Sequence, residues 1–349
     1  MVNVHPFIIC LLVDNILKPL SKMPYDLLHR PRRLRENPIL RDMLAENKIT
    51  TKDLVLPVFV SDSITQPEAI QSMPEIFRWP LDTLSEQVKK WVDLGLKSFA
   101  VFPCISDCKK SEKGDEILNA NSIIYLAANK IKSACGETLL ISDIALDPYT
   151  THGHDGILDN HGKVLNDETV EVLAKASVMA AEVGYDFVAP SDMMDGRVIA
   201  IRNSLDNAQY IHTGIMAYSA KFCSAYYGPF RDAIGTTQSK PIDKSSYQLN
   251  PSNTREAVRE LLLDMQEGAD ILMVKPAEPY LDIIALARQE CELPIAAYQV
   301  SGEYSRIWAA ASQGWLDLDA CAFESLLSIK RAGANIIISY FAERIAKSI

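Results

Sequence analysis

The sequence predicts an α/β protein that folds as a (β/α)8 TIM barrel with an extended N-terminal arm. Eight short apolar segments alternate with longer amphipathic segments along the chain. Several of the short segments are apolar throughout, as strands buried on both faces are. Eight strands alternating with helices are typical of a closed barrel. A doubly wound open sheet is the alternative, but no glycine-rich phosphate motif follows the first strand.

The strands are expected in regular order, and the fifth has the weakest pattern; they are Leu54–Val60, Ser98–Pro103, Thr138–Ile144, Asp186–Pro190, Ala217–Phe222, Ile271–Val274, Pro294–Val300 and Asn335–Tyr340. Helices are expected between them, and three end close to a glycine, a common helix stop: Leu84–Leu94, Val170–Ala181 and Ala257–Gln266. Asn253 and Glu256, at the start of the last helix, resemble a capping box.

Two segments do not fit the alternation of strands and helices. Residues 1–50 precede the first strand and are expected to form the arm, which carries a basic cluster at Arg30, Arg32, Arg33 and Arg35. Residues 51–349 would form the catalytic barrel. Within it, residues from about 225 to 251 make a connection too long for an ordinary loop, which indicates a lid. The lid contains Arg231, Lys240 and Lys244, so it could contact an anion.

The composition indicates a soluble globular enzyme. The chain has 349 residues, 48% of them hydrophobic, and a formal net charge of −10. An acidic surface disfavours nucleic-acid binding. The apolar run at residues 6–13 is too short to span a bilayer and lacks a basic flank, so we expect neither a membrane anchor nor a secretory signal. Seven scattered cysteines suggest reduced thiols and a cytoplasmic location. Translation could start at Met1 or Met23.

Two lysines stand at the ends of neighbouring predicted strands. Lys221 lies near the end of the fifth strand, and Lys275 ends the sixth. In a barrel, functional residues gather at the C-terminal ends of the strands. Either lysine alone could extend its amine to solvent. Two buried amines in one barrel mouth would instead lower each other's pKa, which favours the neutral amine that forms a Schiff base with a ketone.

Other predicted strand ends are polar as well. The third strand ends near Asp143 and Asp147, the fourth is followed by Ser191, Ser301 follows the seventh, and Tyr340 ends the eighth. Each residue alone could cap its strand. Together they could orient a substrate, bind its carboxylate and transfer protons.

From about Arg30 to the C-terminus, the chain resembles the porphobilinogen synthase (5-aminolevulinate dehydratase) family. The resemblance rests on motifs that occur in the family's order: Asp195-Gly196-Arg197, Met216-Ala217-Tyr218-Ser219-Ala220-Lys221-Phe222, Tyr227-Gly228-Pro229-Phe230-Arg231-Asp232-Ala233, Met273-Val274-Lys275-Pro276 and Tyr298-Gln299-Val300-Ser301-Gly302-Glu303. It implies a cytoplasmic lyase of heme (tetrapyrrole) biosynthesis. Such an enzyme condenses two molecules of 5-aminolevulinate to porphobilinogen, with loss of two waters, and it is expected to assemble as a homo-oligomer, an octamer.

The resemblance also implies roles for individual residues. Lys221 and Lys275 would each hold one substrate as an imine. Ser301 and Tyr340 would bind the carboxylate of the substrate on Lys221, which becomes the propionate side. Arg231, Lys244 and Gln248 would bind the second carboxylate. Phe230, Asp143 and Ser191 complete the expected substrate-binding set. Many relatives have arginine in place of Lys244, and lysine lacks the bidentate geometry of arginine.

The resemblance separates two kinds of metal site. Zinc-type members have three cysteines where this chain has Ala145, Asp147 and Asp155, so no tight catalytic zinc is expected. The two aspartates could weakly bind a hard cation such as K⁺ in the active site. Glu260 matches the family's ligand for an allosteric Mg²⁺ near a subunit interface. From its place on the helix alone, Glu260 would be a solvated side chain opposite the core face.

Two other functions are compatible with a barrel that carries lysines. A Schiff-base aldolase normally needs one imine lysine, so a second essential lysine distinguishes the two enzymes. A catalytically inactive barrel, kept as a binding or assembly subunit, would not need the set formed by Lys221, Lys275, Arg231, Ser301 and Tyr340.

Overall fold

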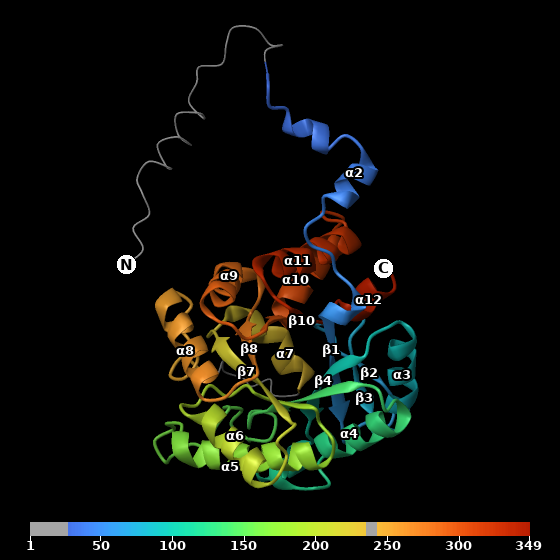
Figure 1. Cartoon of the computed structure of the whole chain (residues 1–349). Coiled ribbons are helices and arrows are strands. Elements are labelled where there is room, and N and C mark those ends of the chain that lie inside the picture. Colours follow the sequence, from blue (N-terminus) through green and yellow to red (C-terminus); the bar gives the residue numbers. More distant parts are fainter. Residues whose placement is uncertain (1–26, 235–242) are drawn as a thin grey trace, which may run out of the picture. The chain divides into compact units, whose positions relative to one another are not determined.

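The computed structural model describes residues 27–234 and 243–349 (Figure 1). Lys240, Cys10, both candidate start methionines and the apolar run at residues 6–13 therefore lie outside the described residues. The chain divides into two compact units between Glu46 and Asn47.

The described part of the first unit consists of two short helical segments. A 3-10 helix, η1, spans Pro31–Leu34, and α2 spans Pro38–Met43. Asn37 caps α2, because its Oδ1 accepts hydrogen bonds from the backbone of Ile39 and Leu40 at 2.8 and 3.4 Å. The extent of the arm remains a prediction.

The second unit contains a closed barrel of eight parallel strands, which confirms the predicted fold. Each strand pairs with the next along the chain, and β10 pairs with β1 to close the ring. All eight predicted strands are present: β1 Leu54–Ser61, β4 Ser98–Cys104, β5 Leu139–Ile144, β6 Phe187–Pro190, β7 Gly214–Lys221, β8 Ile271–Lys275, β9 Ile295–Gln299 and β10 Ile336–Ser339. Their residues are almost all buried, as strands covered by helices on the outside must be.

Two features of the sheet were not predicted. A short hairpin of β2 (Glu68–Ala69) and β3 (Phe77–Pro80) follows β1, and β3 pairs in parallel with the C-terminal end of β1. In addition, β7 begins at Gly214, three residues earlier than predicted, and its register with β8 shifts between Ala217 and Ala220.

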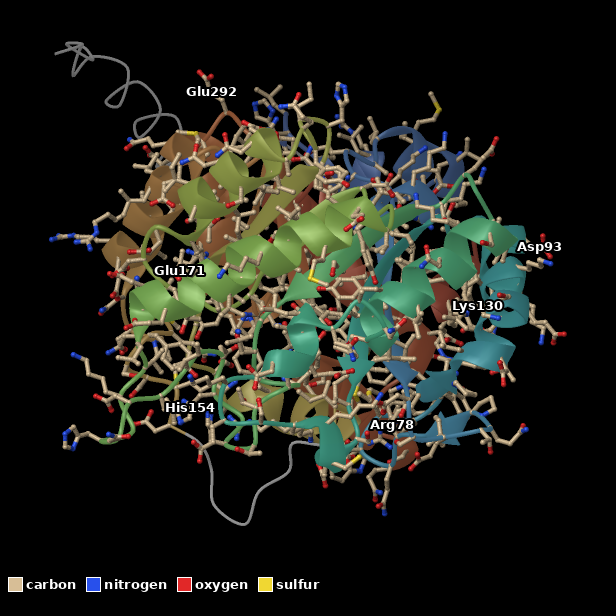
Figure 2. All side chains as sticks on the ribbon, turned by 90° about the horizontal axis from the view of Figure 1, so that it is seen from below. Arg78, Asp93, Lys130, His154, Glu171 and Glu292 are labelled. Carbon is tan, nitrogen blue, oxygen red and sulfur yellow. The ribbon has the colours of Figure 1, made fainter. Side chains whose placement is uncertain are left out.

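Helices surround the barrel; they are α3 Leu81–Asp93, α4 Ile123–Ala134, α5 Asn166–Glu182, α6 Arg197–Asn207, α7 Gly228–Ala233, α8 Thr254–Gln266, α9 Leu281–Glu290, α10 Ser301–Ser312, α11 Leu318–Ala332 and α12 Ala342–Ala346. Short 3-10 segments connect them to the strands: η2 Thr51–Asp53, η3 Asp107–Lys109, η4 Asp115–Leu118, η5 Ala225–Tyr227 and η6 Glu278–Tyr280. The three predicted helices correspond to α3, α5 and α8. The outer faces carry exposed charged side chains, among them Asp93, Lys130, Glu171 and Glu292 (Figure 2).

The helix ends follow the expected signals, with one exception. Gly184 and Gly268 follow α5 and α8 with φ of 95° and 101°, in the left-handed region where glycine is favoured. The capping box at the start of α8 is wrong. The side-chain amide of Asn253 donates to the Glu256 carboxylate at 2.7 Å and makes no hydrogen bond to the helix backbone. The two side chains therefore satisfy each other instead of the helix.

The barrel brings the C-terminal ends of all eight strands to one mouth, where the polar strand-end residues are concentrated. Within the described residues, no helix is both long and apolar enough to cross a membrane. The six described cysteines, from Cys104 to Cys321, are free.

Candidate active site

Lys221 and Lys275 end neighbouring strands and stand directly opposite each other in the register of β7 and β8. Each residue is only 5% exposed. Burying a cationic amine is unfavourable unless it is paired with a carboxylate or loses its proton. The two lysines meet this constraint in different ways.

Lys221 is paired with a carboxylate. Its Nζ lies 3.0 Å from Asp155 Oδ1 and also donates a hydrogen bond to the backbone carbonyl of Ser191. Asp155 is completely buried. Burial alone would raise the pKa of Asp155, but the charges of Lys221 and Lys244 and the hydrogen bonds from both hold it well below its ordinary value. Asp155 is therefore ionised and anchors Lys221.

Lys275 is surrounded by aromatic rings instead. Its Nζ lies 4.6 Å from the ring centre of Tyr298 and 4.8 Å from that of Tyr218. The rings of Phe230 and Tyr227 are 5.3 and 5.5 Å away. Burial, and then the neighbouring charge of Lys221, lower the pKa of Lys275 to about 7. A large fraction of Lys275 is therefore a neutral, nucleophilic amine at neutral pH.

Lys244 bridges the two aspartates that were predicted to bind a cation. Its Nζ lies 3.1 Å from Asp147 Oδ2 and 2.6 Å from Asp155 Oδ2. Burial would lower the pKa of Lys244, but these two carboxylates raise it, so the amine stays charged. Across residues 27–234 and 243–349, no group of three or more His, Cys, Asp or Glu side chains is arranged to hold a metal ion. The position between Asp147 and Asp155 is thus taken by an ammonium group.

Residues from the segment predicted to be a lid contribute to the wall of a small cavity that both lysines also line. This cavity, of about 30 Å³, is lined by Asp147, Lys221, Tyr227, Phe230, Arg231, Lys244, Gln248 and Lys275. Arg78 ties helix α7 to the hairpin by donating to the Ala233 carbonyl at 2.7 Å, and the hydroxyl of Ser72 binds the Asp232 carboxylate. The cavity volume of about 30 Å³ has room for about two water molecules.

Ser301 and Tyr340 lie beside the aromatic residues around Lys275. The Ser301 hydroxyl accepts a hydrogen bond from the backbone of Phe230 at 2.9 Å. The Tyr340 hydroxyl shares a hydrogen bond of 2.9 Å with Tyr298. Each of the two predicted hydroxyls therefore contacts a residue, Phe230 or Tyr298, whose aromatic ring faces Lys275.

Asp143 and Ser191 lie at the ends of β5 and β6. Asp143 is 7% exposed, and Ser191 is 4% exposed. Burial, and then the charge of Asp147, raise the pKa of Asp143 above its ordinary value, while Lys275 and Lys221 act against that rise. A carboxyl group with a raised pKa beside two amines can exchange protons with them near neutral pH.

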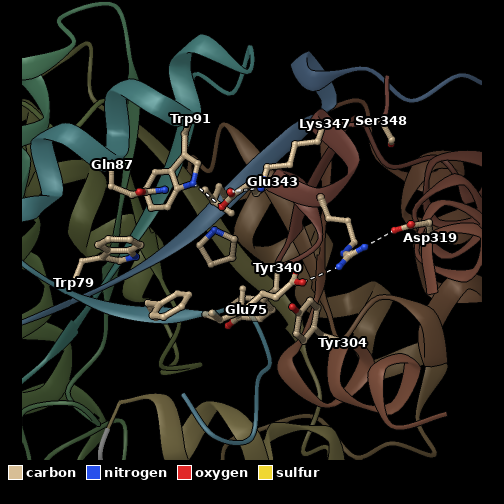
Figure 3. Close-up of a pocket in the computed structure, with 15 residues that line it drawn as sticks. Glu75, Trp79, Gln87, Trp91, Tyr304, Asp319, Tyr340, Glu343, Lys347 and Ser348 are labelled. Atoms are coloured by element: carbon tan, nitrogen blue, oxygen red, sulfur yellow. Dashed lines mark hydrogen bonds and ion pairs between the residues drawn. The ribbon is translucent and has the colours of Figure 1, made fainter. Parts of the chain in front are cut away.

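A larger cavity, of about 780 Å³, lies between β1, β3, α3 and α12 (Figure 3). Its charged residues pair within its own walls. Arg344 contacts Glu75 and Asp319 at 2.8 and 2.6 Å, and Glu343 accepts from Trp91 and Lys347 at 2.7 Å each. Neither Lys221 nor Lys275 lines it, whereas both line the smaller cavity, which is therefore the candidate active site.

Comparison with known proteins decides the family. Residues 28–348 match the family model described as Delta-aminolevulinic acid dehydratase. The chain belongs to the delta-aminolevulinic acid dehydratase family. It is 50% identical to the dehydratase of Chlamydia pneumoniae, over 90% of this chain and 94% of that protein. It is 47% identical to that of Bradyrhizobium diazoefficiens, over 93% and 92% of the two chains.

A solved structure of the dehydratase family is also similar over nearly the whole chain. The delta-aminolevulinic acid dehydratase (porphobilinogen synthase) of Toxoplasma gondii, in complex with the reaction product porphobilinogen, superposes with a TM-score of 0.92. The two proteins are 42% identical, and the match covers 95% of this chain and 96% of that one.

Of the four rings around Lys275, only Phe230 was among the predicted site residues; Tyr218, Tyr227 and Tyr298 were missed. Tyr218 and Lys221 are three positions apart, so regular alternation would place them on opposite faces of β7. The register shift between Ala217 and Ala220 lets both approach Lys275. Tyr247 was also missed; its hydroxyl donates to Asp155 at 2.9 Å. A strand irregularity and a lid contact leave no clear sequence signal.

The helix position of Glu260 suggested a fully solvated side chain, but the structure shows it partly buried. Its side chain is 19% exposed. Burial, followed by the charge of Asp264, raises the pKa of Glu260. Asp264 is itself buried and pairs with Arg197 at 3.1 Å. Glu260 is therefore a partly buried carboxylate beside an ion pair.

We predict that Lys275 loses its proton near pH 7. Its reaction with a small amine-selective reagent, followed by peptide mass mapping, should increase about tenfold per pH unit up to the pKa and then level off. The exposed Lys130 provides the reference reaction. In Lys221→Met, which lacks the neighbouring cation, the midpoint should move upward. A midpoint for Lys275 above pH 9 in the wild type would contradict this assignment.

Proposed function

We propose that this dehydratase condenses two molecules of 5-aminolevulinate into porphobilinogen, with one substrate held as an imine by Lys221 and the other by Lys275. The observation that carries the proposal is the pair of buried lysines standing in register at the barrel mouth. The family match and the product-bound relative support the reaction. An aldolase or an inactive barrel is not supported by any of these findings.

The proposed reaction has a simple balance. Each lysine amine attacks the ketone of one substrate and releases one water. A C–C bond and a C–N bond then join the two substrates, the lysines are released, and loss of a proton makes the ring aromatic. Tethering turns an encounter of two molecules into a reaction within one complex. Lys275 provides a neutral amine directly, whereas Lys221 must first give a proton away.

The contacts favour a pairing of residues that differs from the expected one. Ser301 and Tyr340 were expected to serve the substrate on Lys221, but both lie beside rings that surround Lys275. We therefore assign them to the carboxylate of the substrate on Lys275. The Ser301 hydroxyl donates to the Tyr226 carbonyl at 3.5 Å, and the Tyr340 hydroxyl pairs with that of Tyr298. Rotation of both hydroxyls away from these partners would free two donors for the substrate carboxylate.

Arg231, Lys244 and Gln248 are then assigned to the substrate on Lys221. Lys244 shares Asp155 with Lys221 and has three N–H donors, of which Asp147 and Asp155 use two. The third donor remains for a substrate carboxylate. Each oxygen of the Asp155 carboxylate then has one ammonium group beside it, Lys221 at Oδ1 and Lys244 at Oδ2. Arg231 adds a further positive charge to the cavity wall.

We predict that both lysines are essential for pyrrole formation. Lys221→Ala and Lys275→Ala should each reduce turnover by many orders of magnitude, since tethering and orientation supply roughly 7–11 kcal/mol. Ehrlich's reagent measures the product. Lys132→Ala is the matched control, because Lys132 forms its ion pair with Asp186 at 2.7 Å on the outside of the barrel. Substantial pyrrole formation by either folded active-site variant would refute the proposal.

We further propose that the activating ion is Mg²⁺ at Glu260 and that zinc is not required. Positions 145, 147 and 155 provide no thiolate. Mg²⁺ often binds one or two carboxylates and keeps several waters, and Glu260 and Asp264 provide carboxylates close together. A bound Mg²⁺ would supply positive charge there and relieve their repulsion, while Arg197 continues to hold Asp264.

Glu260→Gln should abolish activation by Mg²⁺ while Lys221 and Lys275 still react with substrate. Glu290→Gln, which removes an exposed carboxylate from α9, should keep the response. Loss of activity on selective removal of zinc, with recovery on zinc alone, would contradict the magnesium assignment. We also propose that the chain assembles as a homo-oligomer, an octamer. Sedimentation of the full chain as a monomer would exclude this assembly.

A further inference from the structure

A completely buried carboxylate joins the two strand ends that carry Lys275 and Ser301. Glu303 is 0% exposed and lies in the first turn of α10. Its Oε2 accepts hydrogen bonds from the backbone N–H of Val300 at 2.6 Å and of Ala277 at 3.4 Å. Its Oε1 accepts from the backbone N–H of Glu278 at 2.5 Å. Every one of these three partners is a donor.

The three donors come from two separate segments. Val300 ends the β9 connection and directly precedes Ser301. Ala277 and Glu278 follow β8 and lie two and three residues after Lys275. The Glu303 carboxylate therefore fixes the backbone that follows Lys275 against the backbone that precedes Ser301. Burial raises the pKa of Glu303, while the backbone hydrogen bonds from Val300 and Ala277 lower it. The three N–H donors that meet its two oxygens favour the ionised carboxylate, which accepts at both oxygens.

The surrounding contacts extend this connection to the lid. The Glu278 carboxylate accepts a hydrogen bond from the Gln299 side chain at 2.9 Å and forms an ion pair with Arg306 Nη2. Nη1 of Arg306 donates to the Tyr226 hydroxyl at 3.1 Å. Tyr226 lies in η5, just before α7. Gly302 packs so closely against this segment that an added Cβ would meet the Tyr226 carbonyl oxygen at 2.4 Å. The strand ends and the start of the lid thus pack as one unit.

We propose that Glu303 is a positioning residue for Lys275. It holds the chain on the C-terminal side of Lys275 so that the amine stays among Tyr218, Tyr298 and Phe230, within reach of the ketone of a substrate whose carboxylate is bound by Ser301. The inference rests on the proposed function of Lys275. Glu303 takes no part in bond formation. It acts through the backbone, and small displacements of a reacting group are costly to catalysis.

Glutamine at position 303 tests the proposal because it keeps the shape but replaces one acceptor oxygen with a donor NH₂ group. Whichever way its amide turns, at least one backbone N–H faces another donor. Glu303→Gln should therefore displace Lys275 while Lys221, which contacts Asp155 and Ser191, keeps its place. We expect kcat to fall roughly 100-fold, with KM changed much less.

The measurement compares borohydride trapping of labelled 5-aminolevulinate on each lysine, by peptide mass mapping, together with kcat and KM. Trapping at Lys275 should fall at least tenfold in Glu303→Gln, while trapping at Lys221 stays within twofold of the wild type. Asp317→Ala is the control for loss of a helix cap, because Asp317 caps α11 by accepting from Ala320 at 2.8 Å, outside the site. It should leave both lysines and kcat unchanged.

The possible outcomes separate this inference from the proposed function. If wild-type Lys275 is never labelled, the proposed function itself fails. If wild-type Lys275 is labelled and Glu303→Gln labels it equally with unchanged kcat, the positioning role is overturned. Equal loss of labelling at both lysines would also overturn it, because that result indicates general destabilisation. Glu303→Asp, which keeps the charge but has a shorter reach, should recover only part of the loss.

Discussion

The in-register pairing of Lys221 with Lys275 across β7 and β8 is the constraint on which the rest of the site depends. Two amines at the ends of adjacent parallel strands cannot move apart without breaking the barrel ladder. Two buried ammonium groups on adjacent strands would repel each other strongly. The fold resolves this by keeping Lys221 charged beside Asp155 and by lowering the pKa of Lys275 among aromatic rings.

This division of roles explains several other features of the site. Asp155 needs two cations to remain ionised while fully buried, and Lys221 and Lys244 provide them. Lys244 belongs to the predicted lid, so its ion pairs connect that segment to the loop after β5 at the barrel mouth. The surroundings of Lys275 are supported by two other contacts. The hydroxyl of Tyr340 pairs with that of Tyr298, and the Glu303 carboxylate binds the backbone that follows Lys275. Each lysine thus has its own supporting contacts.

The sequence was enough to predict the fold and to place Lys221 and Lys275 at strand ends, because both depend on local patterns. Buried parallel strands are nearly continuous apolar runs, and Lys275 closes such a run at a place where barrels carry function. The partners of the lysines were harder to predict. Tyr218 reaches the site only because β7 shifts register, and the direction of Lys244 is set by a lid that packs on Asp147 and Asp155. Helix periodicity likewise missed the partial burial of Glu260, because periodicity identifies only the core face of α8 and says nothing of the groups near its other faces, such as Arg197.

The central claim is that two lysines in unlike surroundings both bond covalently to substrate. Borohydride reduction of the wild-type chain with labelled 5-aminolevulinate, followed by peptide mass mapping, tests it most directly. The account predicts label on the peptides that contain Lys221 and Lys275, and on no peptide from the outer helices. Label confined to one of the two lysines at every substrate concentration and pH would contradict it.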